Sequence, residues 1–555
     1  MSRKKFFNRY SILMSALFIG LALALALPWL ADIQGIAASP DTASGVENNL
    51  DAVNIIYVAK TGDGSAATIG WSTAFTNVQD ALDTAAILGN SEIWVAAGVY
   101  YPDEGKSQID NVVTSTFVIT DNIALYGGFD ISDTHKSERD WVNNVTVLSG
   151  DIDGDDPADA NGVVTDTSNI NGKNAFNVVT ARGVSGTAVL DGFTVTAGYA
   201  SGTSPFNDKG GGLLCDGISS LCSPSLKNLI FSANYAKSSG GGMTNLGTQS
   251  GISSPSLENV SFINNYAIQG GGAMFNNAAN GGNSSPLLNK VAFIGNSTGI
   301  PFNQFTNGGA MLNQGISSGI SSPSLTNVIF SGNSATRDGG AMYNLSISNG
   351  TSSPSLTNVL FSGNSAGLDG GAVFNAGPSG GTSSPKLMNV TFSGNLAGRF
   401  GGAINNSGSD ITMTPEVSNS IFWNNQDSSG ADTISATIVN KTTLITITHS
   451  LVQSAGASGT GIWLSDPSFV DGGNNIDQEP LFVLPVDPST APTTTGDLRL
   501  QSGSPAIDMG NNDFITGVDT DLDGNNRIMG AHVDMGAYEY QIPYKYDRYL
   551  PFIYR

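Results

Sequence analysis

Apolar and polar residues follow one another along this chain in a pattern that recurs about every 31 residues. The unit reads Ser-Pro-Ser-Leu-x-Asn-Val-x-Phe-Ser-x-Asn, and the phrase Gly-Gly-Ala-Met-x-Asn follows it. A fixed period of this length indicates one structural unit stacked on copies of itself. Its prolines stand 30, 31 or 37 residues apart, at Pro224, Pro255, Pro286, Pro323, Pro354, Pro385 and Pro415.

Each unit contains short strand-forming runs between turn-forming residues. Residues 325–330 are rich in β-branched and aromatic side chains, and residues 341–344 form a second run. Gly, Asn, Ser and Asp separate these runs, and no unit holds a helical pattern of useful length. Very short strands at constant period predict an all-β fold, a parallel β-helix. The usual handedness of parallel crossovers makes it right-handed.

Two residues of the unit are expected to form continuous ladders, because stacking places each coil ~4.8 Å above the last. Phenylalanine predicts an interior aromatic stack. Asparagine tolerates a left-handed backbone, and its amide can bond the equivalent asparagine one coil away. These roles are structural, so they favour a scaffold over a ligand site. The ladder positions are Phe231, Phe262, Phe293, Phe330, Phe361 and Phe392, and Asn234, Asn265, Asn296, Asn333, Asn364 and Asn395.

The period continues upstream in a weaker form. Residues 190–200 align with 227–236, and residues 210–215 align with 240–245. Cys215 thereby takes a ladder position that asparagine occupies elsewhere. The 37-residue interval contains an extra segment, residues 300–305, which is either simple loop variation or a binding loop with two phenylalanines.

Open solenoid ends expose unpaired strand edges, so both ends are expected to be covered by atypical segments. At the start, residues 55–58 read as a strand. Residues 76–79 have the Ser/Thr-x-x-Gln form of a capping box, and Val78, Leu82 and Ala85 follow at helical spacing toward Leu88. This pattern predicts one helix over the first coil, with strands at 92–95, 117–119 and 123–126. A C-terminal module is expected to cover the other end.

The chain divides into eight segments on these patterns. They are a signal peptide (1–38), a linker (39–54), an N-terminal cap with the first coils (55–150), irregular coils (151–222), regular repeats (223–426), irregular C-terminal coils (427–500), a C-terminal module (501–540) and a tail (541–555).

The first segment has the order of a secretory signal. Four basic residues precede an apolar run at 11–30, and small residues follow at Ala37, Ala38 and Ser39. An uncleaved membrane anchor is the alternative, since the run is long enough to span a bilayer. No cysteine stands near the cleavage region, which disfavours lipoprotein attachment. The mature chain is therefore expected to be exported.

The chain is acidic, with a formal net charge of −23. Cleavage would remove four positive charges and one negative charge, giving −26. Nucleic acid demands a basic face, so this function class is excluded. The acidity indicates either solubility or cation binding.

Two features suggest disulfide or metal chemistry. Cys215 and Cys222 are the only cysteines, and a disulfide closing a surface loop is favoured over free thiols; the spacing does not fit zinc. Asp519, Asp521 and Asp523 match the first half of a calcium loop, although Gly530 stands where glutamate closes such loops. A structural calcium ion and a solvated acidic turn are the two interpretations. Residues 151–156 are also rich in carboxylates.

Enzymatic chemistry is not expected from the repeats. Hydrolases need paired carboxylates, and lyases need a base beside bound calcium. Between residues 223 and 406 the charged residues are scattered along the sequence, and no Asn-Thr-Asp, Asp-Asp or Gly-His-Gly phrase occurs. Ser, Thr, Asn and Gly fill the positions where a catalytic face would lie.

Several motifs resemble known families. Residues 56–58, 70–72, 93–100 and 125–129 resemble the opening domain of secreted bacterial β-helix proteins of the pectin-lyase-like fold. The phrases Phe-x-x-Asn and Gly-Gly-Ala-Met resemble repeats of chlamydial polymorphic outer-membrane proteins. Residues 504–508, 521–527 and 533–539 resemble a C-terminal choice-of-anchor-type module. The last resemblance implies that Arg527 pairs with a carboxylate of residues 519–523.

The chain departs from the chlamydial family at its end. Those proteins carry a C-terminal membrane barrel, and the fifteen residues after Tyr540 cannot form one. The aromatic and basic tail resembles short tails of secreted bacterial proteins, which implies a sorting or attachment signal. A last strand over the open end is the alternative.

Together these patterns predict a non-enzymatic, exported cell-surface or secreted protein that acts as an adhesion or interaction scaffold. Cell-surface glycans or proteins are the expected partners. A polysaccharide lyase or hydrolase is the first alternative, and a structural surface-layer component is the second. Apart from a structural calcium ion, no cofactor is expected.

Overall fold

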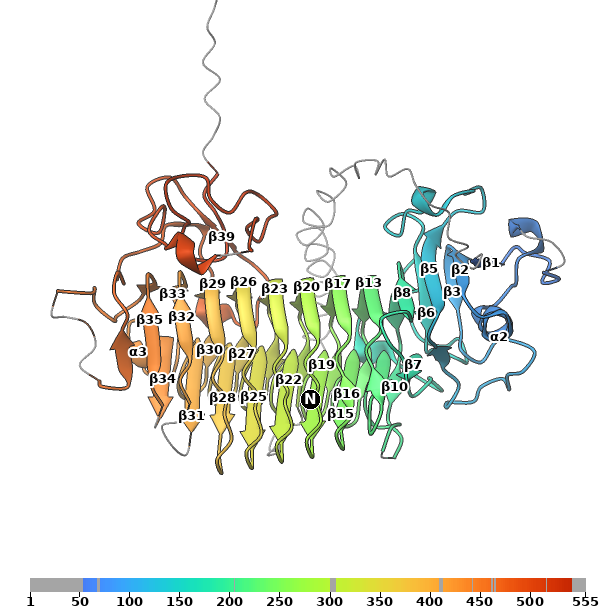
Figure 1. The fold of residues 1–555 in the computed structure, drawn as a ribbon, viewed down its shortest axis with the longest axis horizontal. Helices are drawn as coiled ribbons and strands as arrows, with labels where there is room; N and C mark the ends of the chain where they lie inside the picture. The colour runs from blue at the N-terminus through green and yellow to red at the C-terminus, as the bar shows by residue number, and fades with distance from the viewer. Residues whose placement is uncertain are drawn as a thin grey trace, which may run out of the picture.

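The computed structural model describes residues 53–66, 70–203, 205–299, 306–408, 413–441, 443–460, 463, 466–515 and 517–541. The predicted signal peptide, nearly all of the predicted linker, the segment at 300–305 and all but the first residue of the tail lie outside the described residues. The described chain is an all-β parallel β-helix, so the predicted fold class is confirmed (Figure 1).

Three long parallel sheets run along the coil stack, and we name them sheets A, B and C. Sheet A contains β1 (Asn54–Val58), β2 (Ser91–Ala96), β3 (Gly98–Tyr100), β5 (Ile123–Phe129), β6 (Thr146–Ser149), β8 (Val189–Asp191), β9 (Thr194–Thr196), β13 (Ser225–Ser232), β17 (Ser256–Ile263), β20 (Leu287–Ile294), β23 (Ser324–Ser331), β26 (Ser355–Ser362), β29 (Lys386–Ser393), β32 (Glu416–Ser418), β33 (Ile421–Trp423), β35 (Ile445–Thr448), β36 (Leu451–Val452) and β37 (Phe469–Asp471).

Sheet B contains β4 (Phe117–Ile119), β7 (Val179–Arg182), β11 (Leu213–Asp216), β15 (Met243–Thr248), β19 (Met274–Ala279), β22 (Met311–Ile316), β25 (Met342–Ile347), β28 (Val373–Gly377), β31 (Ile404–Gly408) and β34 (Ile438–Lys441). Sheet C contains β10 (Tyr199–Ala200), β14 (Tyr235–Ala236), β18 (Tyr266–Ala267), β21 (Ser297–Thr298), β24 (Ser334–Ala335), β27 (Ser365–Ala366) and β30 (Leu396–Ala397).

The remaining elements are short. Two strands form a small parallel pair, β12 (Leu221–Cys222) and β16 (Ile252–Ser253), and two form an antiparallel pair, β38 (Phe482–Leu484) and β39 (Asp497–Leu500). The described α-helices are α2 (Val78–Leu88) and α3 (Ile434–Thr437). Single 3-10 turns occur at Trp71–Thr73, Lys136–Glu138, Thr167–Asn169, Pro488–Thr490 and Asn512–Phe514.

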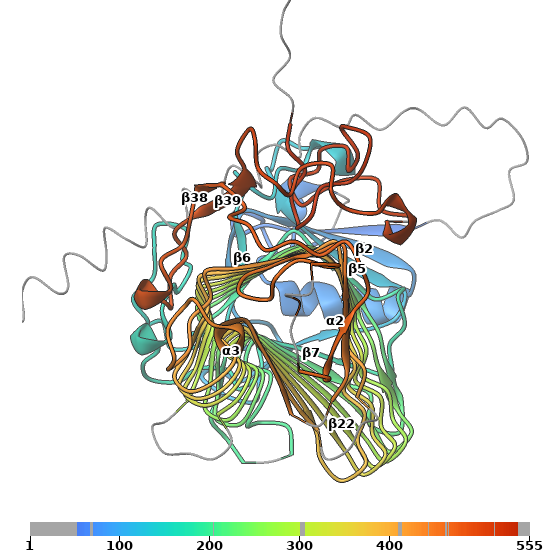
Figure 2. The ribbon, with the colours of Figure 1, turned by 90° about the vertical axis from the view of Figure 1, so that its left-hand side faces the viewer.

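Each regular coil passes through sheets A, C and B in that order. Neighbouring coils pair in register, so that Leu325 lies beside Leu356 and Phe330 beside Phe361. Figure 2 looks along the stack and shows the coils superposed around one shared interior. That interior is the main hydrophobic core, which extends from Ile56 to Phe469.

The predicted aromatic stack is present inside the coils. Phe231, Phe262, Phe293, Phe330, Phe361 and Phe392 continue to Phe422, and all are fully buried. Successive rings are nearly parallel, with centroids 4.6–5.0 Å apart. The spacing of the rings is the spacing of the coils, as the repeat period requires.

The predicted asparagine ladder is also present. The Nδ2 of Asn333 donates to the Oδ1 of Asn364 at 3.0 Å, and its backbone N–H donates to the same oxygen. Equivalent bonds link every step from Asn234 through Asn265, Asn296, Asn333, Asn364 and Asn395 to Asn425. The prediction that these residues take a left-handed backbone is wrong, because the positive φ falls on the preceding residue, such as Gly332 or Asn264.

A second asparagine ladder runs through sheet B. Asn245 donates to Asn276, and the chain of amides continues through Asn313, Asn344, Asn375 and Asn406 to Asn440 at 2.7–2.8 Å. Its members come from the Gly-Gly-Ala-Met-x-Asn phrase, the ladder position that Cys215 occupies in the irregular coil. The two ladders thus account for both recurring terminal asparagines of the unit.

A third row of asparagines holds the left-handed positions within sheet A. Asn228, Asn259, Asn327 and Asn358 have φ of 50–56°, and adjacent pairs share amide hydrogen bonds. Lys290 occupies the same position in the intervening coil with φ of 55°. A left-handed backbone costs lysine more free energy than it costs asparagine.

Replacing Lys290 by asparagine is therefore expected to raise the free energy of unfolding by about 1 kcal/mol. The new amide would also complete the row between Asn259 and Asn327. Urea denaturation followed by circular dichroism measures the change. Lys290→Ala is the control, because it removes the lysine but keeps the strained backbone. Equal stability of the two variants would contradict this explanation.

The helix predicted near Thr76 is present as α2, but its start differs. Asn77, not Thr76, is the N-cap, and its side chain accepts a hydrogen bond from the N–H of Asp80. Asparagine is as good a cap as threonine or better, which is why the capping-box interpretation misplaced the start by one residue. The buried face of α2 joins the main core beside β1 and β2, and the helix lies across the N-terminal end of the stack (Figures 1 and 2).

The C-terminal module lies on the side of the coils over sheet A, not over their end as the sequence predicts (Figure 1). It begins earlier than expected, and we define the lateral module as residues 482–540, from β38 to Tyr540. Its apolar residues pack on outward-facing Leu360, Ile421 and Leu451. The module lies on the side of the coils because it buries these outward-facing apolar residues. At the C-terminal end, Ala455, Trp463 and Phe469 pack against the main core instead.

Candidate functional site

A groove of about 670 Å³ lies on sheet A beside the lateral module. Its floor consists of outward-facing residues of β13, β17, β20 and β23, because side chains alternate between core and surface along each strand. One row of the floor is Ser225, Ser256, Leu287 and Ser324, and the other is Lys227, Glu258, Asn289 and Thr326. Each row crosses four coils, so the groove follows the axis of the stack.

One wall of the groove belongs to the lateral module. Residues 517–520 line it, and the Nδ2 of Asn358 holds this segment by donating to the carbonyl oxygen of Thr520 at 2.6 Å. The wall therefore keeps its place only while the module stays docked on the coils.

The groove contains few charged side chains. Lys227 pairs with Glu258 at 3.3 Å, and both are about half exposed. Asp519 is exposed on the wall. The other polar lining residues are uncharged Ser, Thr and Asn, and Leu287 exposes 59% of its surface. Hydroxyl and amide groups beside an apolar patch suit an uncharged polar ligand.

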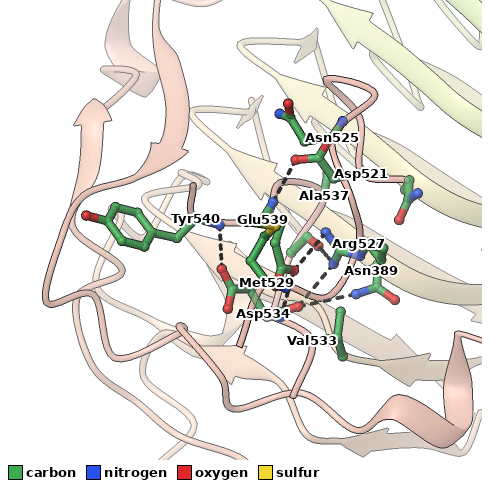
Figure 3. Close-up of polar contacts among 12 residues, drawn as sticks. Asn389, Asp521, Asn525, Arg527, Met529, Val533, Asp534, Ala537, Glu539 and Tyr540 are labelled. Atoms are coloured by element: carbon green, nitrogen blue, oxygen red, sulfur yellow. Dashed lines mark hydrogen bonds and ion pairs between the residues drawn. The ribbon is translucent and has the colours of Figure 1, made fainter. Parts of the chain in front are cut away.

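A buried charge cluster holds the lateral module together where it meets the coils (Figure 3). We define it as Asp521, Asp534, Glu539 and Arg527, none of which exposes more than 5%. The Nη2 of Arg527 donates to the carbonyl oxygens of Asp534 and Gly536. Its Nη1 lies 3.7 Å from Glu539 Oε2, and neither Nη1 nor Nε makes a hydrogen bond within the described structure.

Each carboxylate of the cluster accepts backbone N–H groups from other parts of the module. Glu539 accepts from Met529 and Asp534, and Asp534 accepts from Asp508 and Tyr540. Burial nevertheless dominates, and it raises the pKa of Glu539 to about 7 and that of Asp534 to about 6. Burial also raises the pKa of Asp521.

The three predicted calcium residues do not converge. Asp521 is buried and accepts from the N–H groups of Asp523, Asn525 and Glu539. Asp523 forms a bidentate pair with Arg499, and Asp519 faces the groove. The implied pairing of Arg527 with this segment is also wrong, since its nearest carboxylate partner is Glu539. Asp521 is thus buried and Asp523 is paired with Arg499, and calcium binding by the three residues stays a prediction.

A different acidic group does converge. Asp151, Asp155 and Asp156 each offer an oxygen, and these oxygens lie within 4.8 Å of one another. Burial raises the pKa of Asp156 to about 6 and is also the main reason that the pKa values of Asp151 and Asp155 are raised. Of the described residues, these could supply a set of oxygen ligands to a hard cation.

The charged residues of the repeats are less scattered than the sequence suggests. Asp338 and Asp369 lie on adjacent coils, where the N–H of Asp369 donates to Asp338. Arg399 binds Asp369 through two nitrogens, and Arg337 pairs with Asp338 at 3.1 Å. Their spacings of 30 and 31 residues equal the repeat period, which is the signal that could have predicted the cluster. Both carboxylates are buried and matched by guanidinium groups, so they stabilise the turns.

The two cysteines form a disulfide, but the expected surface position is wrong. Cys215 and Cys222 are both fully buried in the main core. Cys215 lies in register with Asn245, as the alignment of the irregular coil predicts. Because the sulfur offers no amide, Asn245 Oδ1 has no hydrogen-bond partner in the described structure. The buried disulfide thus lies at the N-terminal end of the second asparagine ladder, which begins at Asn245.

No protein-family model matches the chain, and no curated protein matches it. Among solved structures it is similar to the crystal structure of pectate lyase Pel9A, with a TM-score of 0.39 and 13% sequence identity. That match covers 89% of this chain and 98% of the other. Within the described residues, no helix has the length and apolarity required to cross a bilayer.

Proposed function

We propose that this chain is a non-enzymatic, exported interaction scaffold whose groove on sheet A binds an extended, hydroxyl-rich partner such as a cell-surface glycan. The observation that carries the proposal is the floor of the groove, where Ser recurs in three of the four coils of one row and Asn289 and Thr326 continue the other row. A ligand with repeating polar groups can match such rows at several points. The low charge of the lining favours an uncharged chain.

The remaining features support export and attachment. A disulfide is typical of proteins that mature outside the reducing cytosol. The apolar segment at residues 11–30 and the tail at 541–555 fit a secretion signal and an attachment signal, and the repeats resemble those of chlamydial outer-membrane proteins. Cell fractionation followed by immunoblotting of the native protein tests this part. Recovery in the cytosol alone would exclude it.

Binding to a panel of immobilised neutral polysaccharides and purified surface proteins tests the groove. Ser256→Trp places a bulky ring on the groove floor and is expected to reduce binding at least about tenfold, since it removes shape complementarity. Ile320→Trp is the matched control, because Ile320 is 46% exposed and lies outside the groove. Equal binding by the two variants would place the ligand elsewhere. If the chain binds a surface protein and none of the glycans, the partner is a protein and not a glycan.

A carbohydrate-active enzyme is the second candidate, and one observation favours it. Glu258 and Asp519 line the same groove, and Lys227 lies 3.3 Å from Glu258. Two carboxylates or a carboxylate with a base are the groups that glycan cleavage uses. Product analysis after incubation with the polysaccharide panel separates the candidates. Turnover that disappears in Glu258→Gln or Asp519→Asn would establish the enzyme.

A further inference from the structure

The turn that follows β6, residues 151–156, gathers carboxylates, and we name it the acidic turn. Asp151, Asp155 and Asp156 each place one oxygen within 4.8 Å of the other two. Two ligands on opposite sides of a calcium ion lie about 4.6–5.2 Å apart, since each bond measures ~2.3–2.6 Å. The three oxygens can therefore surround one ion from the positions that they already occupy.

A fourth carboxylate joins these three. A β-carbon built on Gly172 would lie 2.5 Å from the Oδ2 of Asp153 and 2.5 Å from the Oδ2 of Asp155. Both oxygens thus occupy the space that a side chain would take at this position, and a residue without a β-carbon is what leaves room for them. The acidic turn thereby brings the charges of all four of its carboxylates together.

No lysine or arginine pairs with the acidic turn in the part of the chain that the structure describes. Lys173 is exposed, and it donates to Asp153 only through its backbone N–H, at 2.9 Å. By contrast, Asp338 and Asp369 are each paired with an arginine. Four neighbouring negative charges repel one another, so a cation among them lowers the free energy of this arrangement.

A buried amide beside the acidic turn lacks one partner. Asn174 exposes only 3% of its surface, and its Nδ2 donates to Asp156 Oδ2 at 2.7 Å and to the carbonyl oxygen of Ala197 at 3.0 Å. Its Oδ1 has no hydrogen-bond partner within the described structure, which is unfavourable for a buried acceptor. This oxygen belongs to the amide that faces Asp156, and amide oxygens are ordinary calcium ligands.

We propose that the acidic turn and Asn174 bind a calcium ion, with the four carboxylates as charged ligands and the amide oxygen as a neutral one. Calcium takes six to eight oxygen ligands in flexible geometry, and its loops carry carboxylates at alternate positions. Asp151, Asp153 and Asp155 have that spacing, and Gly154, with φ of 73°, lets the chain turn between them. The site is separate from the groove, and its existence does not depend on what the groove binds.

The ion would fasten a long segment to the coils. Asp156 also accepts the N–H of Asn171, so the acidic turn lies against the chain that leads to β7. The intervening residues 157–170 contact sheet A, where the buried Val164 accepts the hydroxyl of Ser232 at 2.8 Å through its carbonyl oxygen. A calcium ion at the acidic turn thus holds both ends of this segment in place.

Isothermal titration calorimetry of the full chain with calcium chloride, after a chelator has removed bound metal, tests the site. The parent chain is expected to bind calcium. Asp155→Asn should reduce the affinity at least about tenfold, because affinity depends on the number of charged ligands. Asp155 is exposed, so this variant is expected to fold. Asp110→Asn, an exposed change of the same kind outside the turn, is the matched control and should bind as the parent does. A parent chain that binds no calcium, or parent-like affinity in Asp155→Asn, would refute the site.

Two further variants separate this site from other sources of calcium binding. Gly172→Ala keeps every carboxylate but puts a methyl group where oxygens of Asp153 and Asp155 lie, so it should also weaken binding at least about tenfold. General attraction of calcium to an acidic chain would leave its affinity unchanged. Asp519→Asn should retain the binding. Binding that survives in Gly172→Ala and Asp155→Asn but disappears in Asp519→Asn would place the calcium in the lateral module instead.

Hydrogen–deuterium exchange with mass spectrometry tests what the ion does. With calcium at ten times its dissociation constant, peptides from residues 157–170 are expected to gain about tenfold protection over the chelated chain. Peptides from β22 and β25 should not change. Asp155→Asn should lose most of the gain at the same calcium concentration. Equal protection of residues 157–170 with and without calcium would overturn the fastening role.

Discussion

Replacing Asn333 by alanine is expected to lower the free energy of unfolding by roughly 4 kcal/mol. The side chain accepts from the N–H and the Nδ2 of Asn296, and it donates to Asn364 and to the carbonyl oxygen of Phe293. All of these groups are buried. Alanine leaves at least two of them without a partner, at about 1–3 kcal/mol for each.

Urea denaturation followed by circular dichroism measures this loss. Asn349→Gly is the control, since Asn349 is exposed in a turn with φ of 61°, a conformation that glycine adopts freely. We expect the control to change stability by no more than about 0.5 kcal/mol. A loss below about 1 kcal/mol for Asn333→Ala would mean that water replaces the ladder bonds, and that the ladder does not stabilise the coils.

The second large effect is expected in the aromatic stack. Phe330→Ala should reduce the free energy of unfolding by about 3–5 kcal/mol, because it removes a fully buried ring and leaves a cavity. The ring contacts Phe293 on one side and Phe361 on the other, with centroids 4.7 and 4.8 Å away. The change therefore weakens two coil interfaces at once.

The same denaturation experiment checks this prediction against Ile320→Ala. Ile320 is also apolar and belongs to the same stretch of repeats, but 46% of its surface is exposed. We expect it to cost less than about 1 kcal/mol. Similar losses for the two variants would indicate that the stack is not the main source of stability in the coils.

Much of the fold could be predicted because residues that contact each other on stacked coils recur in the sequence at the repeat period. Phe330 and Phe361 recur at one period since they contact each other, and Cys215 could be aligned with Asn245 for the same reason. The sequence could not show which asparagine of each unit adopts the left-handed backbone. Each unit contains more than one asparagine, all share the same backbone tolerance, and only the three-dimensional path decides that Asn327 and not Asn333 adopts it.

The candidate site was harder to predict because it depends on surfaces that face outward. Ile329 and Leu360 occupy a row in which other coils carry Ser261 or Ala292, and this local apolar excess marks where the module docks. The groove then arises from two segments far apart in sequence, as with Glu258 and Asp519. The carboxylate spacing of residues 519–523 says nothing about burial, so the sequence could not show that Asp521 is removed from solvent.

The two asparagine ladders have a direction, and this limits how the protein can change in length. In both ladders each Nδ2 donates to the Oδ1 of the coil that follows in the chain. A whole repeat inserted or lost in the same orientation therefore restores every amide bond and every ring contact with an identical neighbour. Each gain extends the rod by ~4.8 Å. Tandem duplication could thus adjust the reach of this protein without redesigning its interior.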